Sequence, residues 1–163
     1  MQHRTLFVFD IETVPDTDAV PNLTGFTEPS VVARRAELER YHLEITDGRN
    51  GFPRQPFHRV VAISFLEAEI EHAGAQETYY LKELRSGGEA GFNEEQLLKG
   101  FFQYFEHLKP RLVSFNGRTF DLPVLRYRAM AYGIAAPWLY GAGDKWNSYM
   151  SRYAIDWHCD LLD

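Results

Sequence analysis

The chain has 163 residues, 45% of them apolar, which suits a single globular domain and excludes a disordered or fibrous protein. Its formal charge of −6 argues against strong non-specific binding to duplex DNA, because lysine and arginine supply most of that affinity. The lone Cys159, the lack of a signal-peptide pattern and the lack of an apolar stretch near ~20 residues predict a cytoplasmic protein without a membrane span.

The first predicted element is a strand over residues 5 to 11. This run is β-branched and aromatic with little polar alternation, which is typical of a central strand buried on both faces. Residues 14 to 57 contain five prolines and are predicted to be mostly irregular, apart from one helix over residues 29 to 45. We expect Thr27 to cap this helix, and its apolar face to consist of Val31, Leu38, Tyr41 and Ile45. Because long connections in compact domains are often lids or binding loops, we expect residues 14 to 57 to form a flap within a single domain of residues 1 to 163.

The rest of the chain alternates between strand and helix signals. Two β-rich runs, at residues 59 to 66 and 77 to 81, predict a hairpin across residues 71 to 75. The elements expected after it are a helix at 93 to 109 with Asn93 and Gln96 as its capping box, a strand at 111 to 115, a helix at 120 to 132 and a strand at 153 to 157. This order predicts a mixed α/β sheet with helices packed on it.

Two acidic clusters follow predicted strands. Asp10 and Glu12 are two residues apart, so on a strand they point to the same face. Asp121 lies at the start of a predicted helix, directly after a strand that can lie beside the first one. An ionised carboxylate removed from water needs a compensating cation or hydrogen bonds, so three of them at one place predict a bound metal. Oxygen ligands favour Mg²⁺ or Mn²⁺, and two such ions could clamp a phosphodiester.

These clusters resemble the first two motifs of the DEDD superfamily of 3′-5′ exonucleases. The segments that carry the resemblance are Phe9-Asp-Ile-Glu-Thr-Val-Pro-Asp16, Phe57-His-Arg-Val-Val-Ala-Ile-Ser64 and Ser114-Phe-Asn-Gly-Arg-Thr-Phe-Asp-Leu-Pro-Val-Leu125. They are most similar to bacterial predicted exonucleases related to the proofreading domain of family-B DNA polymerases. The resemblance implies a ribonuclease H-like fold and an enzyme that releases nucleotides from the 3′ end of single-stranded nucleic acid, with DNA as the favoured substrate.

The same resemblance implies roles for individual residues. Asp10, Glu12 and Asp121 would be catalytic and would hold two Mg²⁺ or Mn²⁺ ions, with Asp10 bridging them. The positions near the terminal nucleotide would be Thr13, Asn116 and Phe120. An aromatic ring there can stack on a base.

A third family motif, a Tyr or His followed by a metal-binding Asp, should stand on a helix well after the second motif. In the Tyr form the spacing is Tyr-x-x-x-Asp, and we expect no such pair after Asp121. His158 and Asp163 have the spacing of the His form, but Asp163 is the last residue and no helix is expected beneath it. We therefore expect the chain to stop before this motif, with the family's terminal helices missing and with weak or no activity as a consequence.

Other interpretations stay open at this point. Asp121 could simply cap its helix, and the chain could be a catalytically inert nucleic-acid-binding module or an endonuclease of the same fold. Three arginines near the second motif are candidates for phosphate contact, namely Arg118, Arg126 and Arg128.

Overall fold

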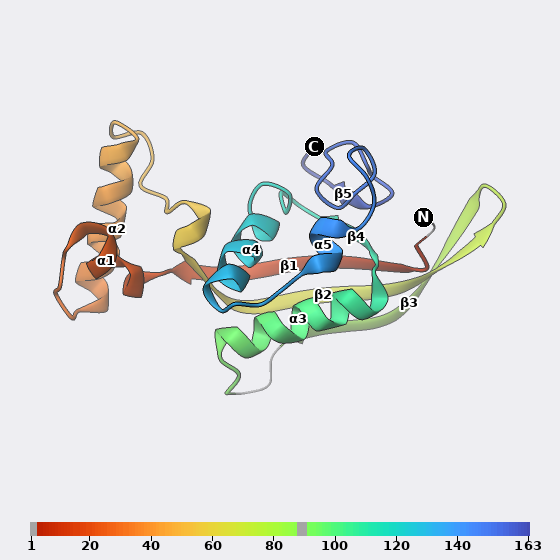
Figure 1. The fold of residues 1–163 in the computed structure, drawn as a ribbon, viewed down its shortest axis with the longest axis horizontal. Coiled ribbons are helices and arrows are strands. Elements are labelled where there is room, and N and C mark those ends of the chain that lie inside the picture. The colour runs from red at the N-terminus through yellow and green to blue at the C-terminus, as the bar shows by residue number, and fades with distance from the viewer. Residues whose placement is uncertain (1–2, 88–90) are drawn as a thin grey trace.

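The computed structural model describes residues 3–87 and 91–163. Its centre is a five-stranded sheet with the order β3-β2-β1-β4-β5 (Figure 1). The strands are β1 (Thr5–Pro15), β2 (His58–Ala73), β3 (Gln76–Gly87), β4 (Arg111–Ser114) and β5 (His158–Asp160). The β1–β2 and β2–β3 pairs are antiparallel, whereas β1–β4 and β4–β5 are parallel. This mixed sheet with its helices is consistent with the expected ribonuclease H-like α/β fold.

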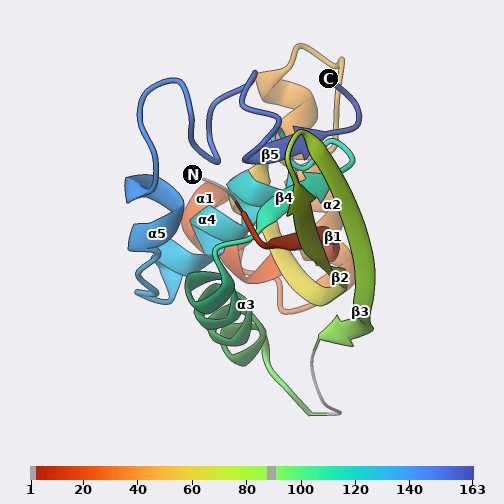
Figure 2. The same cartoon turned by 90° about the vertical axis from the view of Figure 1, so that its right-hand side faces the viewer.

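The helices differ in how they meet the sheet. Figure 2 shows α3 (Glu94–Leu108), α4 (Asp121–Ala131) and α5 (Pro137–Gly141) gathered on one side of it. The short α1 (Val20–Thr24) and the longer α2 (Val31–Ile45) lie together at the end of the molecule where β1 ends (Figure 1). Two 3-10 helices, η1 (Thr17–Ala19) and η2 (Gln55–Phe57), flank this part. None of the helices in the two described ranges is long and apolar enough to cross a bilayer.

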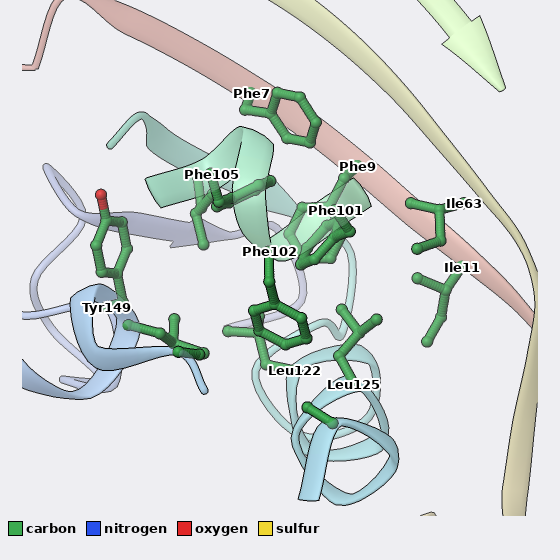
Figure 3. Close-up of a cluster of buried hydrophobic side chains, with 14 of the residues drawn as sticks. Phe7, Phe9, Ile11, Ile63, Phe101, Phe102, Phe105, Leu122, Leu125 and Tyr149 are labelled. Atoms are coloured by element: carbon green, nitrogen blue, oxygen red, sulfur yellow. The ribbon is translucent and has the colours of Figure 1, made fainter. Parts of the chain in front are cut away.

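The core forms between one face of β1 and the helices. Phe7, Phe9 and Ile11 alternate along β1 and are buried, and the Phe7 ring meets Phe105 of α3 edge to face at 4.6 Å (Figure 3). The other face carries Asp10 and Glu12, and both are exposed. The expectation that β1 is buried on both faces is therefore wrong, and the exposed face is the one that bears the carboxylates.

Two further expectations need correction. Helix α2 begins at Val31 and is capped by Ser30 rather than Thr27, and of its predicted apolar face only Leu38 is fully buried. The fifth strand lies at His158–Asp160, where it pairs with β4, and not at residues 153 to 157. Tyr153 is 88% exposed, whereas Ala154 and Trp157 are buried in the core, so the segment packs against the core without forming a strand.

A buried ionic network fixes α4 against its neighbours. Arg128 of α4 donates to both carboxylate oxygens of Glu94 at 2.8 and 2.6 Å, and to Asp16 at 2.6 Å. Glu94 also accepts hydrogen bonds from the Val60 backbone N–H and the Tyr132 hydroxyl. The network joins α3, α4, β2 and the segment after β1, so it holds the helix that begins with Asp121.

Candidate functional site

The site is centred on the Asp121 carboxylate. Strand β4 pairs with β1 only as far as Val8, and beyond that point the Asp121 side chain accepts a hydrogen bond from the Ile11 N–H at 3.2 Å. Burial, together with the negative charge of Asp10, raises the pKa of Asp121 to about 6. The chain therefore brings a carboxylate from the second motif next to one from the first, although they are 111 positions apart.

Asp121 is not the cap of its helix. The N-cap position belongs to Phe120, which makes no side-chain capping bond, and Asp121 is the first helical residue. Its carboxylate faces β1 instead, because that is where the Ile11 N–H needs a partner. The capping alternative is wrong, and the residue is available for chemistry.

Asp10 and Glu12 share the exposed face of β1, as their spacing predicts. Neither forms an ion pair with any residue in ranges 3–87 and 91–163. Carboxylate oxygens that no protein cation neutralises are the kind of ligand that a hard divalent ion such as Mg²⁺ prefers. Among the described residues, however, no three His, Cys, Asp or Glu side chains are grouped closely enough to form a metal site as they stand.

The loop before α4 is held by a residue that the sequence analysis did not single out. Asp160, at the end of β5, accepts hydrogen bonds from the backbone N–H groups of Asn116 and Arg118 at 2.7 and 2.8 Å. Burial alone would raise the pKa of Asp160, but its N–H donors outweigh burial and lower it. Asn116 adopts a left-handed φ of 61°, which asparagine tolerates better than most residues. No local pattern pointed to Asp160, because it follows Asp156-Trp-His-Cys159 rather than an apolar run.

Gly117 is needed for the close packing of this loop. A Cβ atom at that position would overlap the Ser114 side chain at the end of β4. The absence of a side chain therefore lets the chain turn tightly from the strand into the segment that carries Asp121.

Thr13 and Phe120, both predicted to lie near a terminal nucleotide, meet at His58. The Nε2 atom of His58 lies 2.8 Å from the carbonyl oxygen of Pro53, so it carries the proton and donates. Its Nδ1 atom, 3.0 Å away from the Thr13 hydroxyl, then accepts from that hydroxyl. The Phe120 ring packs edge to face on the His58 ring at 5.0 Å. Burial lowers the pKa of His58, which agrees with a neutral ring.

Two of the three candidate arginines are used within the fold. Arg118 donates to the carbonyl oxygens of Ser151 and His158 and pairs with Asp163. Arg128 is part of the buried network with Glu94 and Asp16. Neither guanidinium group is free for a phosphate, so of this set only Arg126 remains a candidate.

The pairs with the spacing of the third motif do not join the site. His158 is fully buried in β5 with its Nε2 atom 2.7 Å from the Ser114 hydroxyl, and Asp163 pairs with Arg118. A second pair, Tyr140 and Asp144, has the Tyr-x-x-x-Asp spacing, so the expectation that no such pair follows Asp121 is wrong. The Asp144 carboxylate caps the N–H groups of Trp146 and Asn147 and lies beside Trp157, where β5 begins. Asp144 thus lies at the amino ends of the parallel strands, whereas Asp121 lies beyond their carboxyl ends.

Comparison with known proteins agrees with the sequence motifs. Residues 50–163, more than half of the chain, match a family described as predicted 3′-5′ exonucleases related to the exonuclease domain of PolB. The match includes Asn116, Phe120 and Asp121, and it begins after Asp10 and Glu12. No curated protein matches the chain. Exonucleases act on nucleic acid and in general depend on divalent metal ions. The chain belongs to the family of predicted 3′-5′ exonucleases related to the exonuclease domain of PolB.

Proposed function

We propose that the protein is a metal-dependent 3′-5′ exonuclease that hydrolyses phosphodiester bonds at the 3′ end of single-stranded nucleic acid, with DNA as the favoured substrate. The observation that supports this most is the position of Asp121, which is buried against β1 beside Asp10. Two carboxylates with no basic partner between them are costly unless a cation is bound.

Each residue of the site has a proposed role. Asp10, Glu12 and Asp121 would hold two Mg²⁺ or Mn²⁺ ions, which when bound neutralise phosphate charge and lower the pKa of water. Thr13 presents its hydroxyl oxygen as an acceptor, because its proton is directed to His58. The partly buried Phe120 offers a ring that can stack on a base. Asn116 keeps the loop before Asp121 in its left-handed turn.

Digestion of a labelled strand tests this proposal. A 5′-labelled single-stranded DNA of twenty nucleotides should shorten stepwise from its 3′ end with Mn²⁺ or Mg²⁺ and stay intact with EDTA. Asp10→Asn and Asp121→Asn should abolish the shortening, whereas Glu106→Gln, an exposed carboxylate on α3, should not alter it. Cleavage of a circular strand would identify an endonuclease instead, and an RNA strand of the same sequence reports on sugar preference.

A second candidate function is a catalytically inert nucleic-acid-binding module. The positions of the two pairs with third-motif spacing favour it, because neither supplies a general base at the site. Loss of general base assistance typically slows a reaction 10²–10⁴-fold. Metal-independent strand binding with no shortening over hours would support this alternative and refute the exonuclease proposal.

A further inference from the structure

A hollow of about 390 Å³ lies beside the candidate site. Its walls are Thr13 and Pro15 of β1, Arg35 and Glu39 of α2, residues 51 to 53, and His58. Its lining adjoins residues of the candidate site, because Thr13 directly follows Glu12 and because His58 packs on Phe120, the residue before Asp121. Its volume is in the range of small-ligand sites.

The ring of Phe52 at this hollow is exposed although its loop is firmly held. Phe52 is 59% exposed, yet its ring lies 4.9 Å from His58 and 5.9 Å from Phe120 between centroids. The three rings thus form one aromatic group that extends from the start of α4 into the hollow. An exposed phenylalanine ring costs solvation free energy unless something covers it.

Hydrogen bonds on both sides of Phe52 fix the loop. The Phe52 N–H donates to the Asn50 side chain, and the Pro53 carbonyl accepts from His58. The Arg54 N–H donates to His42, which is itself buried in α2 and donates to the Leu38 carbonyl. Gln55 donates to the Thr119 carbonyl in the loop that precedes α4. The ring is therefore held in place before any ligand arrives, which lowers the entropy cost of binding.

The hollow is lined by one cationic and one anionic side chain, Arg35 and Glu39. Arg35 is exposed on α2 and forms no ion pair with any residue of the described ranges. Glu39, one turn later on the same helix, also lines the hollow and would repel a phosphate placed near it. A ligand with one phosphate and one flat aromatic group could pair its phosphate with Arg35 and stack its aromatic group on Phe52.

We propose that this hollow binds one nucleotide of the single-stranded substrate, with its base stacked on Phe52 and its phosphate facing Arg35. This inference rests on the proposed function and assigns part of the insertion between the first motif and β2 to substrate binding. Stacking on aromatic rings tolerates any base, because every base has a π-face. The hollow thus adds affinity for a single strand without sequence preference.

The test measures strand binding in EDTA, where no cleavage interferes. A fluorescent ten-nucleotide single strand is titrated by anisotropy with the wild-type protein and with Phe52→Ala, Phe52→Trp and Tyr80→Ala. Phe52→Ala should weaken binding about tenfold, as expected for one stacked base, while Phe52→Trp stays within twofold. Tyr80 lies on the edge strand β3 and is 48% exposed, so Tyr80→Ala is a matched control that should bind like the wild type.

Two further measurements separate the contribution of the base to binding from that of the phosphate. A strand of abasic sites should bind equally to the wild type and to Phe52→Ala, because it has nothing to stack. Arg35→Gln should reduce the slope of log Kd against log salt by about 0.7, the value for one phosphate contact on a single strand. Equal binding by Phe52→Ala and Tyr80→Ala, the same loss on the abasic strand, an unchanged salt slope, or no binding by the wild type would each overturn the proposal.

The binding and cleavage assays together distinguish failure of the nucleotide site from failure of the proposed exonuclease function. Phe52-dependent binding without metal-dependent cleavage would refute the exonuclease proposal and keep the nucleotide site. Cleavage by the wild type with no effect of Phe52→Ala on binding would refute the nucleotide site and keep the exonuclease proposal.

Discussion

The buried carboxylate of Glu94 gives the sharpest prediction of stability. Glu94 is 6% exposed and accepts four hydrogen bonds, from Val60, Tyr132 and two nitrogens of Arg128. Glu94→Gln keeps the size of the side chain but removes its charge, which leaves the Arg128 guanidinium with Asp16 as its remaining ionic partner. Breaking a buried ion pair by removing one partner typically costs about 3–5 kcal/mol. We expect the free energy of unfolding to fall by that amount.

Denaturation in urea, followed by circular dichroism, measures this change. The matched control is Glu95→Gln on the next residue of the same helix turn, whose carboxylate pairs with Lys99 at the surface. That pair is half-exposed, so its loss should cost less than about 1 kcal/mol. If the two variants unfold within 1 kcal/mol of each other, the network does not hold α4 against the sheet as argued.

Three more predictions concern the site and its supports. Asp10→Asn removes a negative neighbour of Asp121, so the pKa of Asp121 should fall below about 6 in a carboxyl NMR titration; an unchanged pKa would mean that the two carboxylates are not coupled. Burial lowers the pKa of His158 to about 4, so the unfolded chain takes up the proton first as the pH falls below 6.5. Between pH 6.5 and pH 4 the wild type should therefore lose about 3 kcal/mol more stability than His158→Gln, and parallel stability curves would contradict this. Gly117→Ala should lower the melting temperature by several degrees because its methyl group overlaps Ser114, whereas Gly100→Ala, where a Cβ meets no atom of the described residues within 4 Å, should not; equal melting temperatures would show that the loop relaxes freely.

The sequence predicted the elements whose signals are local. The apolar run of β1 and the capping box of Asn93 and Gln96 both appear as expected, because neighbouring residues alone determine them. The hairpin of β2 and β3 is longer than the predicted runs of residues 59 to 66 and 77 to 81. Strand β2 continues to Ala73 since Glu67, Glu69 and Glu71 lie on the strand rather than beyond its end.

The errors lie where distant contacts decide the structure. Strand β5 is three residues long and forms only because β4 offers a parallel edge, which no local pattern reveals. The apolar residues Val31 and Ile45 on α2 are exposed, since this helix packs mainly against α1 and η1. That residues 14 to 57 form a mobile flap stays a prediction, and amide hydrogen exchange as slow there as at residues 60 to 65 would refute it.

The candidate carboxylates were found from their motifs, whereas their supports were not. The spacing of Asp10 and Glu12 correctly placed both on one strand face. The role of Asp160, which holds the loop before Asp121, depends on a contact across 44 positions and could not be predicted. Phe52 was equally hidden, because its exposure only becomes informative once the hollow beside Thr13 is known.

The most direct test of the central claim is calorimetric titration of the protein with Mn²⁺. We predict saturable binding that is lost in Asp10→Asn and in Asp121→Asn and kept in Glu106→Gln. At about 100 times Kd the ion should add ~2.7 kcal/mol to the free energy of unfolding. Mn²⁺ binding that is the same in Asp10→Asn and Asp121→Asn as in the wild type, or no binding at all, would contradict a metal site at these carboxylates.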